Sequence, residues 1–262
     1  MKKIHIQSEL IYESRENSDY VFNIQAAYHP WQTIESENVI INPFCTMTYG
    51  VGHTGQNRLA KMSSPFGTFS VKYEATVQVN YPPPTGNEEE MRINELPIDI
   101  IPYIWSSRYC ESDALTSLAN NTFGQIPRGF QRVETICQWI RDNIKYEIGH
   151  TNSLTSTRNV LDLRIGVCRD FAHLGISFCR ALNIPARFVT GYAKFEDPPT
   201  DYHAIFEAYL GGRWILFDPT QMSPIEDLVR IGTGRDASDT AFSTIFGAVV
   251  MTSMNPYVEI IQ

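Results

Sequence analysis

Two adjacent glycines, Gly211-Gly212, constrain the fold of this chain more than any other feature. They separate two runs rich in aromatic and branched residues, 201–210 and 213–220, and so predict two antiparallel strands joined by a two-residue turn. Such a turn fixes the register, because the residue before it must pair with the residue after it. In that register His203 and Asp218 share a face as diagonal neighbours, roughly 7–8 Å apart at the backbone. The turn alone therefore predicts contact between an imidazole and a carboxylate.

A second stretch, 166–182, predicts an amphipathic helix that begins at or just after Cys168. Its apolar residues recur with the roughly 3.6-residue period of a helix, at Phe171, Leu174, Phe178 and Leu182. The segment Asn183-Ile184-Pro185 then ends the pattern. Unpaired N–H groups and the positive end of the dipole at a helix N-terminus favour a thiolate over a thiol. Cys168 is therefore placed where a cysteine nucleophile is expected.

Each of these three side chains has an ordinary structural explanation when it is taken alone. A lone cysteine is most often buried, a lone histidine often sits satisfied in a core, and Asp218 precedes Pro219 as a turn residue would. Together, Cys168, His203 and Asp218 provide the nucleophile, the base and the orienting carboxylate of thiol catalysis. This interpretation requires the fold to bring the hairpin to the N-terminus of the helix.

Several short motifs follow one another between about residues 113 and 247. They are Gly166-Val167-Cys168-Arg169-Asp170-Phe171-Ala172, Ala181-Leu182-Asn183-Ile184-Pro185-Ala186-Arg187, Gly191-Tyr192, His203-Ala204 and Phe217-Asp218-Pro219-Thr220. In these motifs the chain resembles the transglutaminase-like superfamily, and more closely its bacterial branch, which is described as cysteine proteases. The resemblance implies a papain-like fold in which Cys168 is the nucleophile, His203 the base and Asp218 the orienting residue.

Two further positions bear on the same resemblance. The block Gly234-Arg235-Asp236 with Asp239 is similar to one in that bacterial branch, although the residues themselves indicate no role for it. The family often has a tryptophan two residues after the histidine, where this chain has Ile205. We therefore expect one wall of the cleft to differ in shape, with the triad unchanged.

Composition narrows the possible partners and cofactors. Acidic residues outnumber basic ones, 29 to 21, which gives a net charge of −8 and a pI near 5.3. This balance argues against a nucleic-acid partner, since phosphate binding needs a basic surface. Five scattered cysteines without a CxxC pair argue against a disulfide scaffold and a zinc site, so no metal or other cofactor is expected. No apolar leader or membrane-spanning stretch is visible, and we expect a cytoplasmic protein without a membrane partner.

At 262 residues the chain is long enough for two domains of an α+β protein. Residues 1–85 contain short or alternating β-rich runs, clearest at 68–79, and predict an antiparallel β-sandwich. Residues 86–110 follow a proline run and predict a linker, extended at 97–103. Residues 111–262 are expected to form the transglutaminase-like catalytic core. Within the core, helices are expected over 113–119, 127–145 and 159–163, and a loop over 197–200 before His203.

The function that follows is thiol-dependent acyl transfer on a peptide or protein substrate. Hydrolysis of a peptide or amide bond is favoured, with cross-linking by amine transfer as the alternative and a catalytically idle peptide-binding module as a third reading. The Cys168 backbone N–H is expected to form half of an oxyanion hole. Trp139 is conceivable as the other half, but its helical spacing is more typical of a core residue.

Overall fold

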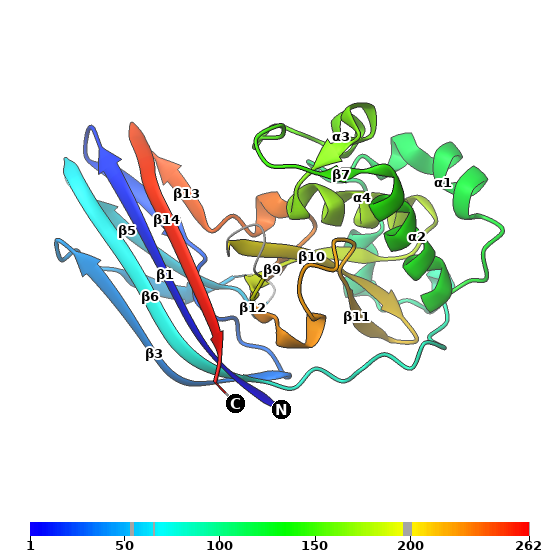
Figure 1. The fold of residues 1–262 in the computed structure, drawn as a ribbon, viewed down its shortest axis with the longest axis horizontal. Helices are drawn as coiled ribbons and strands as arrows, with labels where there is room; N and C mark the ends of the chain where they lie inside the picture. The colour runs from blue at the N-terminus through cyan, green and yellow to red at the C-terminus, as the bar shows by residue number, and fades with distance from the viewer. Residues whose placement is uncertain (53–54, 65, 196–200, 262) are drawn as a thin grey trace.

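The computed structural model describes residues 1–52, 55–64, 66–195 and 201–261, which form a β-sandwich and a mixed helix and sheet core (Figure 1). The predicted loop at 197–200 lies outside the described residues. The α+β fold class expected from the sequence is confirmed, with antiparallel sheets throughout both parts apart from one short parallel pair.

Two four-stranded sheets make up the sandwich on the left of Figure 1. The first has the order β14 (Val249–Ile260), β1 (Lys2–Ser14), β6 (Gly67–Val79) and β3 (Gln32–Asn42). The second has the order β13 (Ser243–Phe246), β2 (Ser18–Phe22), β5 (Arg58–Ser64) and β4 (Thr48–Val51). The alternation at 68–79 is confirmed, because every second residue from Phe69 to Val79 is buried between the two sheets.

A third antiparallel sheet lies at the centre of the core. Its order is β11 (Arg213–Phe217), β10 (Tyr202–Leu210), β9 (Ala186–Tyr192) and β12 (Val229–Gly234). Apolar side chains of α2 (Phe130–Asn143) and α4 (Cys168–Ala181) form one cluster with those of this sheet. The smaller elements are α1 (Thr116–Phe123), α3 (Thr157–Leu163) and a parallel pair of β7 (Lys145–Tyr146) with β8 (Ile165–Gly166). Helices thus occur in each of the predicted helical regions, with shifted ends.

The helix α4 lies unusually close to β10 because Gly175 faces the strand. A Cβ atom at this position would stand 2.4 Å from the ring of Phe206. Real Cβ atoms do not approach other atoms so closely, so the helix can rest on the strand only with glycine here. The apolar residues that predicted the helix, from Phe171 to Leu182, are buried in the cluster that the helix forms with the sheet and the neighbouring helices.

The glycine hairpin has the predicted register. Leu210 pairs with Arg213 and Phe206 with Phe217. Gly211 and Gly212 have φ values of 56° and 80°, which residues with side chains rarely adopt. Alternate residues of both strands, including Phe206 and Phe217, join the cluster under the helices, as the register requires.

The structure corrects the predicted core range of 111–262 at its C-terminal end. Strand β14 pairs with β1 from Ile4↔Ile260 to Ser14↔Val249, and β13 pairs with β2. The chain therefore returns to the sandwich after leaving the core (Figure 1). Pairing between residues about 250 positions apart leaves no local signal in the sequence, which shows only a short stretch of low charge there.

The expectation of an extended crossing at 97–103 is also wrong. Residues Ile98–Tyr103 form a 3-10 helix whose Ile100 is buried in a cluster with Leu96 and Tyr209. Upstream, the Glu88 carbonyl accepts a hydrogen bond of 2.8 Å from the Phe130 N–H at the start of α2. The connection after the sandwich is therefore packed along the core, because its apolar residues find partners on the hairpin.

We predict that Gly175→Ala lowers the free energy of unfolding by about 1–3 kcal/mol, the usual cost of overpacking. This loss would occur although alanine favours helices by about 1 kcal/mol over glycine. Chemical denaturation measures it, and Phe206→Leu in the same chain should restore part of the stability. Gly50→Ala is the matched control, since a Cβ there meets nothing within 4 Å. Equal stability of Gly175→Ala and Gly50→Ala would contradict the close contact.

Candidate active site

Cys168 is the first residue of α4, as the sequence predicts. Val167 is the N-cap, and its backbone N–H donates to the Asp170 carboxylate at 3.0 Å, which satisfies one of the free donors at the helix start. Thr151 donates to the same carboxylate oxygen at 2.6 Å, and Arg169 binds the other oxygen. This buried carboxylate fixes the turn that presents the Cys168 thiol. The thiol itself remains partly exposed.

The predicted contact between imidazole and carboxylate is present. Nε2 of His203 donates to Oδ2 of Asp218 at 2.8 Å, with both side chains almost completely buried. The other carboxylate oxygen accepts from the backbone N–H and the hydroxyl of Thr220, at 2.8 and 2.7 Å. Asp218 is thus held from one side by the turn that follows it and can orient the imidazole from the other.

The remaining ring nitrogen of His203 faces the cysteine. Nδ1 makes no hydrogen bond of normal geometry within the described residues, and His203 and Cys168 line the same cleft. Burial lowers the pKa of His203, but the hydrogen bond to Asp218 and the neighbouring Cys168 raise it from 6.5 to about 10. The geometry therefore brings the three side chains together in the order thiol, imidazole, carboxylate, and favours the protonated imidazole.

Both parts of the molecule shape the cleft at Cys168. Its volume is about 360 Å³, and its walls include Phe188 of the central sheet, Phe242 before β13 and Met254 of β14. The Phe242 ring stacks on Tyr202 with 5.2 Å between centroids. The Tyr202 hydroxyl in turn shares a hydrogen bond of 2.6 Å with Ser8 of β1. The C-terminal return to the sandwich thus supplies one wall of the cleft.

Tyr146 is a residue of the site that the sequence reasoning missed. Burial raises the pKa of its phenol, and so does the adjacent Cys168 thiol, while the Cys168 backbone N–H, which interacts with the hydroxyl, lowers it. Tyr146 is held beside the cysteine because it pairs in parallel with Gly166, which lies two residues before Cys168. A two-residue strand formed across about 20 residues of loop and helix has no periodicity to detect, so no local pattern indicated this position.

Trp139 has the core role that its spacing favoured. Its ring packs edge-on against Phe123 and Phe178, at centroid distances of 6.0 and 5.3 Å, and it does not line the cleft. These ring contacts give Trp139 a role in packing α2 against its neighbours.

The block at residues 234–239 has a structural role. The Asp236 carboxylate accepts from the backbone N–H of Tyr109 at 2.9 Å and caps the short helix that begins at Ala237. Arg180 of α4 donates to the Arg235 carbonyl at 2.5 Å. These bonds fix the segment that carries the cleft residues Ala237, Thr240 and Ala241.

The other cysteines lie in unreactive surroundings or outside the cleft. Burial raises the pKa of Cys110 to about 12 and also raises the pKa values of Cys137 and Cys179. Cys45 is half-buried beside the sandwich core. Across the described ranges, no group of three or more histidine, cysteine, aspartate or glutamate side chains is arranged to hold a metal ion.

Two known protein families match this chain. The model of the transglutaminase-like superfamily matches residues 116–219, and the model of the bacterial transglutaminase N-terminal domain matches residues 1–99. A crystal structure of a candidate cysteine protease from Cytophaga hutchinsonii is 40% identical, with a TM-score of 0.95 over 100% of this chain and 91% of that one. This chain belongs to the transglutaminase-like superfamily. The resemblance seen in the sequence motifs is thereby confirmed.

The curated relatives that match this chain come from mycobacteria. An uncharacterised protein of Mycobacterium leprae is 34% identical over 140 residues, which are 49% of each chain. One of Mycobacterium bovis is 28% identical over 135 residues, 46% of this chain and 42% of its own. The chain spans about half the length of the curated relatives it matches. No helix among the described residues is long and apolar enough to cross a membrane. Cytoplasmic localisation stays a prediction.

We predict that the His203–Asp218 pair makes the folded protein less stable as the pH rises above neutrality. A pKa raised on folding contributes stability that is complete below the unfolded value of about 6.5 and is lost as pH rises through the folded value. The free energy of unfolding should therefore fall from near neutrality toward the folded pKa of about 10. The slope reaches at most about 1.4 kcal/mol per pH unit.

Urea denaturation at a series of pH values measures this slope. Asp218→Asn removes the carboxylate that raises the pKa of His203 and should flatten the decline. Asp142→Asn makes the same chemical change on the exposed side of α2 and should leave the decline as in the wild type. An identical slope in all three proteins would show that the buried pair does not hold a proton.

Proposed function

We propose that this protein catalyses thiol-dependent acyl transfer through Cys168, His203 and Asp218, with hydrolysis of a peptide or amide bond as the reaction. The observation that carries the proposal is the position of His203, whose Nε2 is bound to Asp218 while Nδ1 faces the thiol. A buried imidazole between a thiol and a carboxylate is the arrangement that activates a cysteine nucleophile. Membership of the superfamily supports the same class of chemistry.

In the first half of the reaction the Cys168 sulfur attacks the substrate carbonyl carbon. His203 holds the proton of the thiol at Nδ1, and its Nε2–H remains bound to Asp218. The new sulfur–carbon bond places a negative charge on the carbonyl oxygen. When this intermediate collapses, the carbon–nitrogen bond breaks, and His203 gives its proton to the departing amine. The product is a thioester on Cys168 and a free amine.

We further propose that the Cys168 backbone N–H and the Tyr146 hydroxyl bind the oxyanion. In the free protein the hydroxyl interacts with this N–H and with the thiol. A carbonyl oxygen that enters beside the sulfur would meet both donors at once. When the hydroxyl turns from this N–H toward that oxygen, both groups donate to it where the negative charge develops.

In the second half, His203 takes a proton from water, and the resulting hydroxide attacks the thioester. The carbon–sulfur bond breaks, the acid product leaves, and the thiolate is restored. An amine in place of water would give a new amide, which is the cross-linking reaction. The partly apolar cleft walls, with Phe188, Phe242 and Met254, suit the side chains of a peptide or protein substrate.

The test is turnover of a peptide library, followed by mass spectrometry with and without an added primary amine. We expect new carboxyl termini in both conditions and their loss in Cys168→Ala. Products that carry the amine would instead identify amine transfer. Binding of peptides without any turnover would favour the idle binding module over this proposal.

Tyr146→Phe tests the oxyanion assignment on the substrate so identified. We expect kcat/KM to fall about 100-fold, the usual loss for one oxyanion-hole donor. Tyr257→Phe on β14 removes an exposed phenol hydroxyl away from the cleft and serves as the control. A Tyr146→Phe protein as active as this control would remove Tyr146 from the mechanism.

A further inference from the structure

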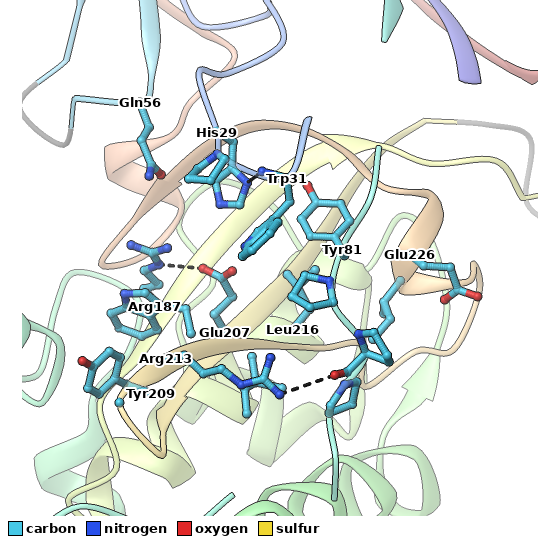
Figure 2. A pocket seen from close by; sticks show the side chains of 18 residues that line it. His29, Trp31, Gln56, Tyr81, Arg187, Glu207, Tyr209, Arg213, Leu216 and Glu226 are labelled. Atoms are coloured by element: carbon cyan, nitrogen blue, oxygen red, sulfur yellow. Dashed lines mark hydrogen bonds and ion pairs between the residues drawn. The ribbon is translucent and has the colours of Figure 1, made fainter. Parts of the chain in front are cut away.

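A second cavity lies where the sandwich side of the molecule meets the central sheet. Its volume is about 630 Å³, larger than the catalytic cleft, and neither Cys168 nor His203 lines it. Figure 2 shows Trp31 and Tyr81 reaching it from the sandwich side, with Arg187, Glu207 and Leu216 on the central sheet. Cavities of this size are typical of sites for small organic molecules. The proposed acyl transfer makes no use of it.

The floor of this cavity carries an unbalanced positive charge. The Glu207 carboxylate accepts from Nε of Arg187 at 2.6 Å and from both terminal nitrogens of Arg230, at 3.0 and 2.5 Å. Burial raises the pKa of Glu207, but the two arginines hold it well below its usual value, so the carboxylate is ionised. Two guanidinium groups thus share one carboxylate, and a single positive charge remains uncompensated in a buried site.

Arg187 is the group that can offer this charge to a ligand. Its Nε donates to Glu207, and among the described residues its two terminal nitrogens donate to no acceptor. The central carbon of its guanidinium lies over the ring of Trp214, 4.1 Å from the centroid, and only 10% of the side chain is exposed. The stacking and the bond to Glu207 hold the free edge of the fork in a fixed direction.

The walls above this floor are flat and apolar. Trp31 is 45% exposed although it is a large aromatic residue, and Tyr81, Trp214, Leu216 and a run of prolines also line the cavity. The position of Trp31 is fixed by its neighbour Gln32, whose side chain bonds to the backbone N–H and carbonyl of Arg230 at 2.9 and 3.0 Å. The cavity is therefore preformed by contacts between the two parts of the chain.

No further positive charge comes from the histidine at the rim. Burial, and then the nearby Arg230, lower the pKa of His29 to about 3, so its imidazole is neutral. Arg213 is paired with Glu88 at 2.5 Å. A dianion such as a phosphate monoester is therefore disfavoured, because it would find one available cation and would also lie near the carboxylates of Glu207 and Glu226. A cationic ligand is disfavoured because the free guanidinium of Arg187 would repel it.

We propose that this cavity binds a small monocarboxylate with a flat apolar or aromatic body. The carboxylate pairs with the terminal nitrogens of Arg187 in the two-bond geometry that guanidinium groups favour. The body lies among Trp31, Tyr81 and Trp214, and the exposed ring of Trp31 offers it a face to stack on.

Calorimetric titration with phenylacetate as the probe tests the proposal on the full chain. We expect one saturable site with a dissociation constant below about 1 mM. Phenylacetamide lacks the charge, acetate lacks the ring and benzylphosphonate carries a second charge, so each should bind at least about tenfold more weakly. Absence of saturable phenylacetate binding, or equal binding of the amide, would overturn the proposal.

Variants locate the bound probe. Trp31→Ala removes a largely exposed ring and should weaken phenylacetate binding at least about tenfold. Arg187→Gln should abolish it, while Arg230 continues to pair with Glu207. Trp105→Ala, an exposed tryptophan outside the lining, is the control and should bind as the wild type does. If Arg187→Gln does not fold, Trp31→Ala decides, and wild-type affinity in Trp31→Ala would show that the probe sits elsewhere.

Discussion

The close packing of α4 on β10 is the contact on which the candidate site depends. Cys168 comes from the start of the helix, and His203 comes from the strand, so the distance between thiol and imidazole is set by how the two elements meet. Gly175 permits the approach, and the Phe206 ring fills the space beneath it. The same strand is joined by the glycine turn to β11, which is followed directly by Asp218. One packed layer therefore positions all three groups that we propose for catalysis.

The sandwich contributes residues to both the catalytic cleft and the second cavity. Its strand β14 follows the core along the chain, and that return brings Phe242 and Met254 to the cleft beside Cys168. On the other side of the contact, Gln32 binds the backbone of Arg230, and Arg230 neutralises Glu207 inside the central sheet. The two parts of the molecule are thus joined through buried polar groups, which lose their partners if the parts separate. This explains why the cleft and the second cavity both draw residues from each part.

The sequence predicted the features that arise from local rules. A helix period ending in Asn183-Ile184-Pro185, a two-glycine turn and an alternating strand at 68–79 each define faces, and the faces place Cys168, His203 and Asp218 correctly. What the sequence could not predict depends on pairing over long separations. Three contacts are of this kind: the pairing of β14 with β1, the parallel pairing that brings Tyr146 to Cys168, and the ion cluster at Glu207. In each, the local sequence pattern of one segment does not indicate which segment it will contact. The 3-10 helix at 98–103 was missed because so short a helix leaves no periodic pattern in the sequence.

The central claim is that His203, oriented by Asp218, activates Cys168, and the rate of thiol alkylation tests it without a known substrate. Iodoacetamide modification near neutral pH, followed by peptide mass spectrometry, gives the rate at each of the five cysteines. An unactivated thiol reacts slowly below about pH 8.5 because little thiolate is present. The account predicts that Cys168 reacts much faster than the half-buried Cys45, and that Asp218→Asn slows Cys168 while leaving Cys45 unchanged. Equal rates at the two cysteines, or a Cys168 rate unaffected by Asp218→Asn, would contradict it.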